Sequence, residues 1–176
     1  MRAAHIRAIE LARQQGGIIS FDPNLRFPLW KDPEALRKAV RDFLPLADVV
    51  KISDEELEFI TGEREIERAL PKLLRGNVKL VVYTCGKDGA HAFTRTIGAY
   101  QPAVTMQAVD TTGAGDGFIG AFLWKLQQYG VDVQTLAAVG GDVLEDCLRF
   151  SNRFAGISVA SHGAIPSYPT LEEMSE

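Results

Sequence analysis

The stretch Asp110-Thr111-Thr112-Gly113-Ala114-Gly115-Asp116 runs directly into the apolar segment Phe118–Leu126, and this stretch decides the fold. Residues 104–109 before it alternate weakly and predict a strand, whereas residues 115–129 after it repeat apolar side chains at helical spacing. A glycine-rich turn therefore joins a strand to the start of a helix, where glycine lets the backbone approach a ligand closely. The free N–H groups and the macrodipole of a first helical turn favour a phosphate or another anion at this place.

Asp116 is the unexpected residue of this turn, because a carboxylate repels a phosphate unless it has a chemical task. The task that fits is removal of a proton from a hydroxyl group that attacks phosphorus. In that interpretation the backbone N–H groups of Gly113, Ala114 and Gly115 form an anion hole for the transferred group. The structural alternative is a helix-start residue, since Asp is common in the first turn of a helix.

Two other nucleotide-binding patterns are tested by their context. Residues 115–120 match the dinucleotide pattern G-x-G-x-x-G, but residues 131–153 after the helix predict more helix rather than a strand ending in an acidic residue. That context argues against NAD binding. The chain also lacks the Walker A sequence Gly-x4-Gly-Lys-Ser/Thr, which excludes a P-loop enzyme.

Helical and extended segments alternate along the 176 residues, which predicts an α/β layer fold with a mostly parallel central sheet. We expect residues 1–176 to form a single α/β domain, because no linker, repeat or low-complexity stretch interrupts the alternation. Helices are predicted over residues 2–15, 33–44, 54–62, 63–74, 115–129 and 131–161 (with a break near Gly140), and strands over 18–21, 47–52, 78–83, 90–94, around Tyr100 and over 104–109.

Polar signals follow four of the predicted strands, at Asp22, Ser53, Thr84 and Asp110. In open α/β sheets, ligands bind outside the carboxyl ends of the strands. Four such signals at one edge of a sheet favour a shared site over four independent turns.

The composition is ordinary for a globular protein, with 46% hydrophobic and 24% charged residues. The net charge of −4 argues against a nucleic-acid partner, which usually meets a basic face. No apolar run is long enough to span a membrane, and the first residues lack the apolar core of a signal peptide. With only two cysteines, far apart in sequence, the expected location is the reducing cytoplasm.

Residues 110–118 resemble the C-terminal signature of the ribokinase-like (PfkB-type) sugar kinases, and the resemblance extends over nearly the whole chain. Within that family the chain is most similar to fructokinases, because Phe-Asp-Pro-Asn-Leu-Arg-Phe-Pro-Leu-Trp at 21–30 is typical of them. Residues 51–56 resemble the family's Asn-x-x-Glu segment, with Ser53 in place of Asn. Residues 84–89 match its Thr-x-Gly-x-x-Gly nucleotide turn, and the ending 163–171 is also similar.

The resemblance implies a three-layer α/β/α ribokinase-like fold and ATP-dependent phosphorylation of a sugar hydroxyl. The implied acceptor is fructose, and the alternative is another sugar such as ribose. Asp116 would be the general base. Glu56 would act through water on Mg²⁺ and phosphate, although its spacing from Ser53 also suits a capping box.

The resemblance also assigns binding residues. Asn24 and Arg26 are phosphate or substrate candidates, since a guanidinium group suits phosphate oxygens, and a surface ion pair is the alternative for Arg26. The nucleotide candidates are Thr84, Gly86, Gly89 and Asn152, and an ordinary turn is the alternative for the first three. The candidates for a monovalent cation such as K⁺ are Asp110, Thr112, Ser158, Ser161, Gly163 and Ser167.

Members of this family are considerably longer than 176 residues, so we expect the chain to correspond to their C-terminal portion. The N-terminal half and the lid, which carry most sugar contacts in relatives, would then lie outside this sequence. Expected partners are nucleotide, sugar and either a complementary N-terminal half or further copies of the chain. The alternative function is a catalytically incompetent fragment that binds nucleotide or a partner chain.

Overall fold

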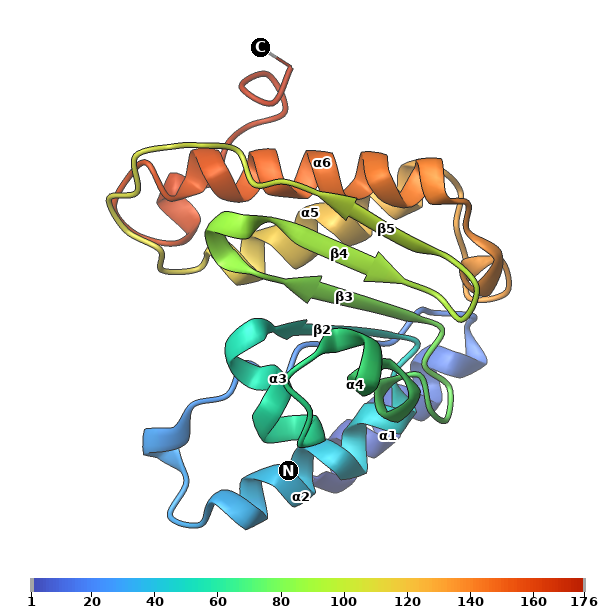
Figure 1. Cartoon of the computed structure of the whole chain (residues 1–176). Helices are drawn as coiled ribbons and strands as arrows, with labels where there is room; N and C mark the ends of the chain where they lie inside the picture. Colours follow the sequence, from blue (N-terminus) through green and yellow to red (C-terminus); the bar gives the residue numbers. More distant parts are fainter. Residues whose placement is uncertain (1, 176) are drawn as a thin grey trace. The chain divides into compact units, whose positions relative to one another are not determined.

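The computed structural model describes residues 2–175, and its strands and helices alternate as an α/β protein (Figure 1). The strand order is β1-β2-β3-β4-β5. The chain forms two compact units. The first comprises the chain up to Thr84 with residues 93–97 and 132–138, and the second comprises residues 85–92, 98–131 and those from 139 onward.

Three parallel strands form the sheet of the first unit: β1 (Ser20–Phe21), β2 (Val49–Ser53) and β3 (Leu80–Thr84). Ser20 of β1 pairs with Val49, and Ser53 pairs with Thr84. Strand β2 lies between the other two and is buried along nearly its whole length. This burial explains why its sequence is a continuous apolar run rather than an alternation.

Four helices belong to the first unit: α1 (Arg2–Gln14), α2 (Pro33–Phe43), α3 (Asp54–Thr61) and α4 (Ile66–Leu73). Their ends follow the predicted signals. Asp32 caps α2 by accepting a hydrogen bond of 2.9 Å from the N–H of Glu34. Gly62 ends α3 in the left-handed conformation, with φ of 74°.

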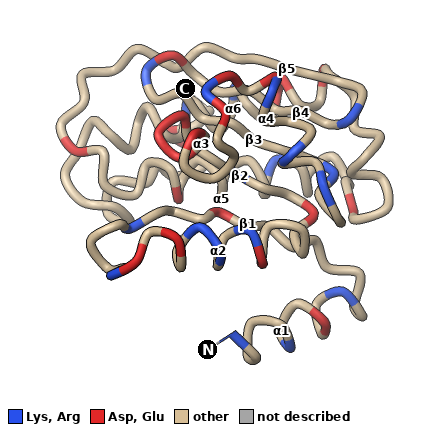
Figure 2. The backbone as a smooth tube through the Cα atoms, turned by 60° about the horizontal axis from the view of Figure 1, so that its bottom comes forward, with Lys and Arg blue, Asp and Glu red and all other residues tan. Residues whose placement is uncertain are grey.

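The core of the first unit lies between these helices and the strands. Helices α2, α3 and α4 each bury an apolar face. Basic and acidic residues both occur along α2 (Figure 2), and Lys38 pairs there with Asp42. The principal core residues are Leu36, Val40, Val50, Ile52, Leu57, Ile60, Ile66, Ala69, Leu73 and Val81.

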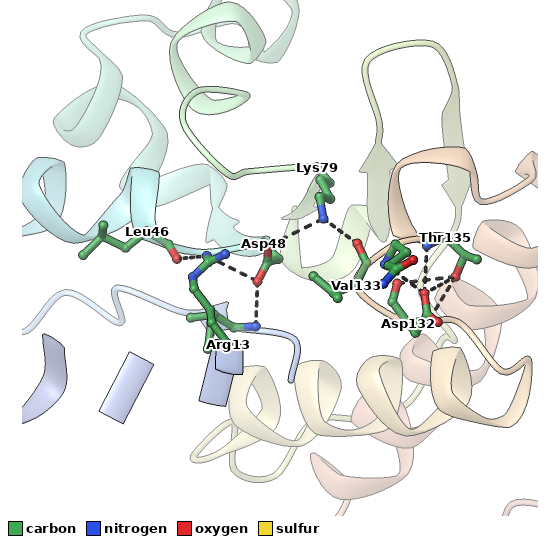
Figure 3. Close-up of polar contacts among 9 residues, drawn as sticks. Arg13, Leu46, Asp48, Lys79, Asp132, Val133 and Thr135 are labelled. Atoms are coloured by element: carbon green, nitrogen blue, oxygen red, sulfur yellow. Dashed lines mark hydrogen bonds and ion pairs between the residues drawn. The ribbon is translucent and has the colours of Figure 1, made fainter. Parts of the chain in front are cut away.

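A buried carboxylate, Asp48, ties the amino ends of these strands together (Figure 3). Its Oδ2 accepts a hydrogen bond of 3.0 Å from the N–H of Ile19, and Arg13 lies 3.5 Å from the same oxygen. Lys79 Nζ lies 3.9 Å from Oδ1 and donates to the carbonyl oxygen of Val133. This cluster fixes α1, β2, β3 and the 132–138 segment through a few polar contacts.

The second unit contains β4 (Ala90–Phe93) except for its last residue, together with β5 (Gly98–Gln101), α5 (Ala114–Gln128) and α6 (Gly141–Ser158). Helix α6 packs against α5 and β5. Phe118, Phe122 and Leu126 form the buried face of α5, and Leu144 and Leu148 contribute from α6. The predicted helix at 115–129 is thus confirmed with slightly shifted bounds, and the helix predicted over 131–161 is confirmed only over Gly141–Ser158.

Two predicted segments are wrong. Residues 104–109 form no strand, and Val104, Met106 and Val109 are exposed, so no neighbouring strand covers or pairs with them. Residues 131–140 are not α-helical apart from the short 3₁₀ turn Leu136–Ala138, because Asp132 and Thr135 satisfy each other's backbone and side-chain groups locally.

None of the helices in residues 2–175 combines the length and apolar character needed to cross a membrane.

Candidate functional site

The glycine-rich turn opens α5 with a backbone conformation that only glycine adopts easily. Gly113 is the residue before the helix and has φ of 78°. A Cβ at this position would lie 2.6 Å from Cβ of Ala164 and 2.9 Å from the hydroxyl of Tyr168. At Gly117 a Cβ would lie 2.8 Å from the ring of Phe154. The sequence needs these glycines for close packing as well as for access to a ligand.

Two N–H groups of this turn are open. Ala114 donates its N–H to the carbonyl oxygen of Thr111 at 3.2 Å. The N–H groups of Gly113 and Gly115 have no hydrogen-bond partner within the described part of the chain. Of the three amides predicted to form an anion hole, Gly113 and Gly115 therefore have the open N–H groups.

Asp116 lies in the first turn of the 15-residue α5, and its side chain is exposed. The hydroxyl of Tyr168 reaches the same turn and donates a hydrogen bond of 2.8 Å to the carbonyl oxygen of Gly113. Burial, and secondarily the charge of Asp116, raises the pKa of Tyr168. An exposed carboxylate thus stands beside two open amides and a fixed phenol.

Asp110, just before this turn, links it to the loop that contains Gly163. Its Oδ1 accepts the N–H of Thr112 and its Oδ2 accepts the N–H of Gly163, both at 2.9 Å. The donors on Thr112, and next the N–H of Gly163, lower the pKa of Asp110 to about 2. Asp110 does not follow a strand as predicted. Its N–H and that of Val109 donate instead to the carbonyl oxygen of Val159 after α6.

Only some of the other candidates for a cation site lie near Asp110. Thr112 and Gly163 contact it directly, as described above. The hydroxyl of Ser167 donates to the carbonyl oxygens of Gly163 and Ala164, which places it on the same loop. Ser158 is buried and donates to Ala155 within α6, whereas Ser161 is exposed. A hydroxyl oxygen that donates a hydrogen bond keeps its own lone pairs, so this oxygen-rich loop is chemically suited to a monovalent cation.

Two nucleotide candidates, Gly86 and Gly89, lie in a turn between β3 and β4. Both have positive φ, 51° and 97°, and the N–H of Cys85 donates to the carbonyl oxygen of Gly89 at 2.8 Å. A Cβ on Gly89 would collide with the backbone of Gln101 and Pro102, whereas Gly86 faces open space. Gly86 is therefore the glycine of this turn beside which a ligand has room.

Asn152 has a structural role that its sequence position did not suggest. It is buried on α6, and its Nδ2 donates hydrogen bonds of 2.9 Å to the carbonyl oxygens of Gln101 and Pro102. Both amide protons are engaged, so Asn152 could meet a nucleotide only through its Oδ1.

In the first unit, three of the four predicted polar signals meet at one edge of the sheet. Asp22 directly follows β1, while Ser53 and Thr84 end β2 and β3 and are paired across them. This part of the shared-edge prediction is confirmed. The hydroxyl of Thr84 turns back to the carbonyl oxygen of Ile52 at 3.4 Å.

Glu56 connects two loops at this edge. Its Oε2 accepts the N–H of Ser53 at 3.0 Å, as a capping box requires, and its Oε1 accepts the N–H of Leu25 at 2.8 Å. The carboxylate is only 8% exposed. Capping is thus observed, and the second bond shows that capping is not the only role of Glu56.

Asn24 and Arg26 lie on the loop that Glu56 holds. Asn24 has φ of 43°, a strained value for a residue with a side chain, and its N–H donates to Oδ1 of Asp22 at 3.1 Å. Arg26 is exposed two residues further on. The loop therefore presents a guanidinium group at the carboxyl edge of the strands.

Lys51 is the residue of this edge that sequence reasoning missed. It is 7% exposed on β2, and its Nζ lies 3.0 Å from Oδ2 of Asp22. The available signal was a lysine inside the apolar run Val49-Val50-Lys51-Ile52, because a charge in a buried strand requires a partner.

No cluster of three or more His, Cys, Asp or Glu side chains suited to a metal occurs among residues 2–175.

Comparison with known proteins decides the family. The sequence profile described as "pfkB family carbohydrate kinase" matches residues 1–171, nearly the whole chain. The chain belongs to the pfkB family of carbohydrate kinases. The resemblance in the glycine-rich turn and its companion segments is confirmed by this match.

The most similar relatives include fructokinases. Fructokinase-2 of Solanum habrochaites is 41% identical over 173 residues, which are 98% of this chain and 51% of that protein. Fructokinase-2 of Solanum lycopersicum is 40% identical over the same length. The chain spans about half the length of the curated relatives it matches.

Solved structures agree with the fold. The chain superposes on the fructokinase of Xylella fastidiosa with bound ATP with a TM-score of 0.88 at 30% identity, covering 96% of this chain and 54% of that one. The Vibrio cholerae O395 fructokinase double mutant, in its fructose, ADP and potassium ion bound form, gives 0.86 at 32% identity, over 99% and 54%. The predicted ribokinase-like α/β class is confirmed.

Proposed function

We propose that this pfkB family chain serves ATP-dependent phosphorylation of a sugar hydroxyl, with fructose as the acceptor. The observation that carries the proposal is the pair of open N–H groups at Gly113 and Gly115, which stand beside Asp116 in the first turn of α5. Such a turn offers both an anion hole and a base within a few residues.

In the proposed reaction Asp116 takes the proton from the attacking hydroxyl. The open amides of Gly113 and Gly115 stabilise negative charge on the transferred phosphoryl group as it develops. The bond from Tyr168 to Gly113 keeps the turn in place, so that the amides need no reorganisation during the reaction. Catalysis then rests on positioning and charge, as phosphoryl transfer requires.

The nucleotide is assigned to the residues predicted for it: Thr84, Gly86, Gly89 and, through Oδ1, Asn152. Arg26, with Asn24 beside it, would contact phosphate oxygens. Mg²⁺, when bound, would neutralise phosphate charge, and Glu56 would hold it through water. The loop around Asp110 would bind K⁺ or a similar cation, which stabilises the neighbouring anion hole.

The acceptor is proposed from the relatives. Those with the names given above are fructokinases, and one solved relative contains fructose, ADP and a potassium ion. Because this chain spans about half of those proteins, we further propose that a complementary N-terminal half supplies most sugar contacts.

Two measurements test this function. Calorimetry of the folded chain with millimolar ATP, Mg²⁺ and K⁺ should show binding, and a flat titration would remove the nucleotide assignment. Fructose-dependent ADP release should appear when the N-terminal half of a related fructokinase is added, with ribose and glucose as controls. Equal rates with all three sugars would contradict fructose as the acceptor, and no release with any of them would favour a non-catalytic fragment.

A further inference from the structure

Lys51 occupies a position where a charge is costly. It is the middle residue of β2, which lies between β1 and β3, and its neighbours Val50 and Ile52 are completely buried. A lysine in such a strand loses most of its hydration and must be offset by a partner. The contacts of the Lys51 ammonium group therefore decide whether this charge is tolerated inside the sheet.

Asp22, the partner of Lys51, also holds a turn of the chain. Lys51 Nζ lies 3.0 Å from Oδ2 of Asp22, while Oδ1 of the same carboxylate accepts the N–H of Asn24. The next N–H along the chain, that of Leu25, is held by Glu56. Two carboxylates thus accept hydrogen bonds from consecutive amides of one loop. Lys51 holds the first carboxylate, Asp22, from inside the sheet.

The charges of this group support a role beyond packing. Burial raises the pKa of Asp22, the charge of Lys51 acts against that rise, and the charge of Glu56 adds to it. Lys51 is therefore the cation that offsets the burial of Asp22 and the nearby charge of Glu56. Without Lys51 the pKa of Asp22 would be raised further, and the carboxylate would lose the contact that holds it beside the loop.

We infer that Lys51 is a positioning residue for the phosphate contacts of this site: through Asp22 it holds the Asn24–Leu25 turn, and so sets where Arg26 meets the phosphates. This inference rests on the proposed function for its ligand, Mg·ATP. It assigns Lys51 no contact with substrate, since the side chain ends at Asp22. Its effect on binding passes through the loop.

A second lysine–aspartate pair, in which the aspartate is buried and the lysine is partly exposed, provides the control. Lys79 lies 3.9 Å from the buried Asp48, near the amino ends of the same strands (Figure 3). Replacing either lysine by methionine removes a cation from beside a buried or largely buried carboxylate. Only Lys51 is linked to the loop that carries Arg26, so the two variants separate a positioning role from a general loss of stability.

The first measurement is amide hydrogen exchange by NMR on the full 176-residue chain. Lys51→Met should accelerate exchange by about tenfold at Asn24, whose acceptor Asp22 is no longer held, and at Leu25, the next amide of the loosened turn. Lys79→Met should leave these two amides unchanged. Unchanged exchange at Asn24 and Leu25 in Lys51→Met would overturn the inference. If that variant does not fold, Asp22→Asn/Lys51→Met removes both charges together and is measured with the same expectation.

The second measurement is the affinity for Mg·ATP. Lys51→Met should weaken it about tenfold, while Lys79→Met should not, and the effect of Lys51→Met should nearly vanish in an Arg26→Ala background. Full additivity with Arg26→Ala would overturn the inference, since a merely structural loss does not depend on Arg26. If the unaltered chain binds no Mg·ATP, the proposed function fails, and the exchange rates alone decide whether Lys51 positions the turn.

Discussion

The hydroxyl of Tyr168 and the carbonyl oxygen of Gly113 are joined by a hydrogen bond of 2.8 Å between residues 55 positions apart. Gly113 is the last residue before α5, and Tyr168 follows the short helix Ile165–Ser167. The bond therefore fixes the glycine-rich turn from a distant segment, two residues before the open amide of Gly115.

Tyr168→Phe should cost about 0.5–1.5 kcal/mol of unfolding free energy, the usual worth of one hydrogen bond. The ring would still pack against Phe154, at a centroid distance of 5.3 Å, so the loss isolates the hydroxyl. Affinity for Mg·ATP should fall as well, because the turn loses its external support. Urea unfolding and calorimetry measure the two effects. Tyr129→Phe, which removes an exposed hydroxyl bonded to Asp146, is the control and should leave nucleotide affinity unchanged.

Gly113→Ala should destabilise the protein and abolish nucleotide binding. The positive φ alone costs about 1–3 kcal/mol for a residue with a Cβ, and the collision with Ala164 adds to it. Gly120→Ala on the same helix is the matched control, because its Cβ would meet nothing within 4 Å. That change should stabilise the protein by about 0.5–1 kcal/mol. If the unfolding temperatures of both variants shifted in the same direction from that of the unaltered chain, this account would be contradicted.

The sequence alone predicted this turn well because its signals are local. The order of glycines and acidic residues at 110–116 defines a turn and a helix start without any distant contact. The capping of α2 by Asp32 and of α3 by Ser53 and Gly62 was predictable for the same reason. Each depends on residues within one helical turn.

Long-range contacts could not be predicted in this way. The bond of Tyr168 to Gly113, the pairing of Lys51 with Asp22 and the ties from Asn152 to the end of β5 all join residues far apart in sequence. The missing strand at 104–109 has the same origin. Its alternation is real, but a strand also needs a neighbour to accept its hydrogen bonds, and alternation says nothing about that neighbour.

The carboxyl group of Asp110 should stay ionised to an unusually low pH. Its folded-state pKa is lowered to about 2 from 3.8, so its stabilising effect is fully present above pH 4 and is lost as the pH falls toward 2. Carbon-detected NMR titration of the side chain measures the pKa directly. Asp110→Asn should reduce the change in stability between pH 4 and 2. Thr112→Val, which keeps the backbone donor and removes the hydroxyl, should move the pKa of Asp110 part of the way back toward 3.8.

Asp116→Asn should separate catalysis from binding. The amide keeps the shape of the side chain and cannot take up a proton, so kcat for fructose phosphorylation should fall by about 10²–10⁴-fold in any preparation that shows fructose-dependent ADP release. Affinity for Mg·ATP should hold or rise slightly, because a negative charge near the phosphates is removed. Asp142→Asn is the control, since Asp142 also lies in a first helical turn, that of α6, and loses the same favourable interaction with the helix dipole. Both variants should show a similar small change in stability, and only Asp116→Asn should lose turnover. Near-full activity of Asp116→Asn would show that another group takes the proton, and a parallel loss in Asp142→Asn would show that the effect arises from helix stability rather than from a base.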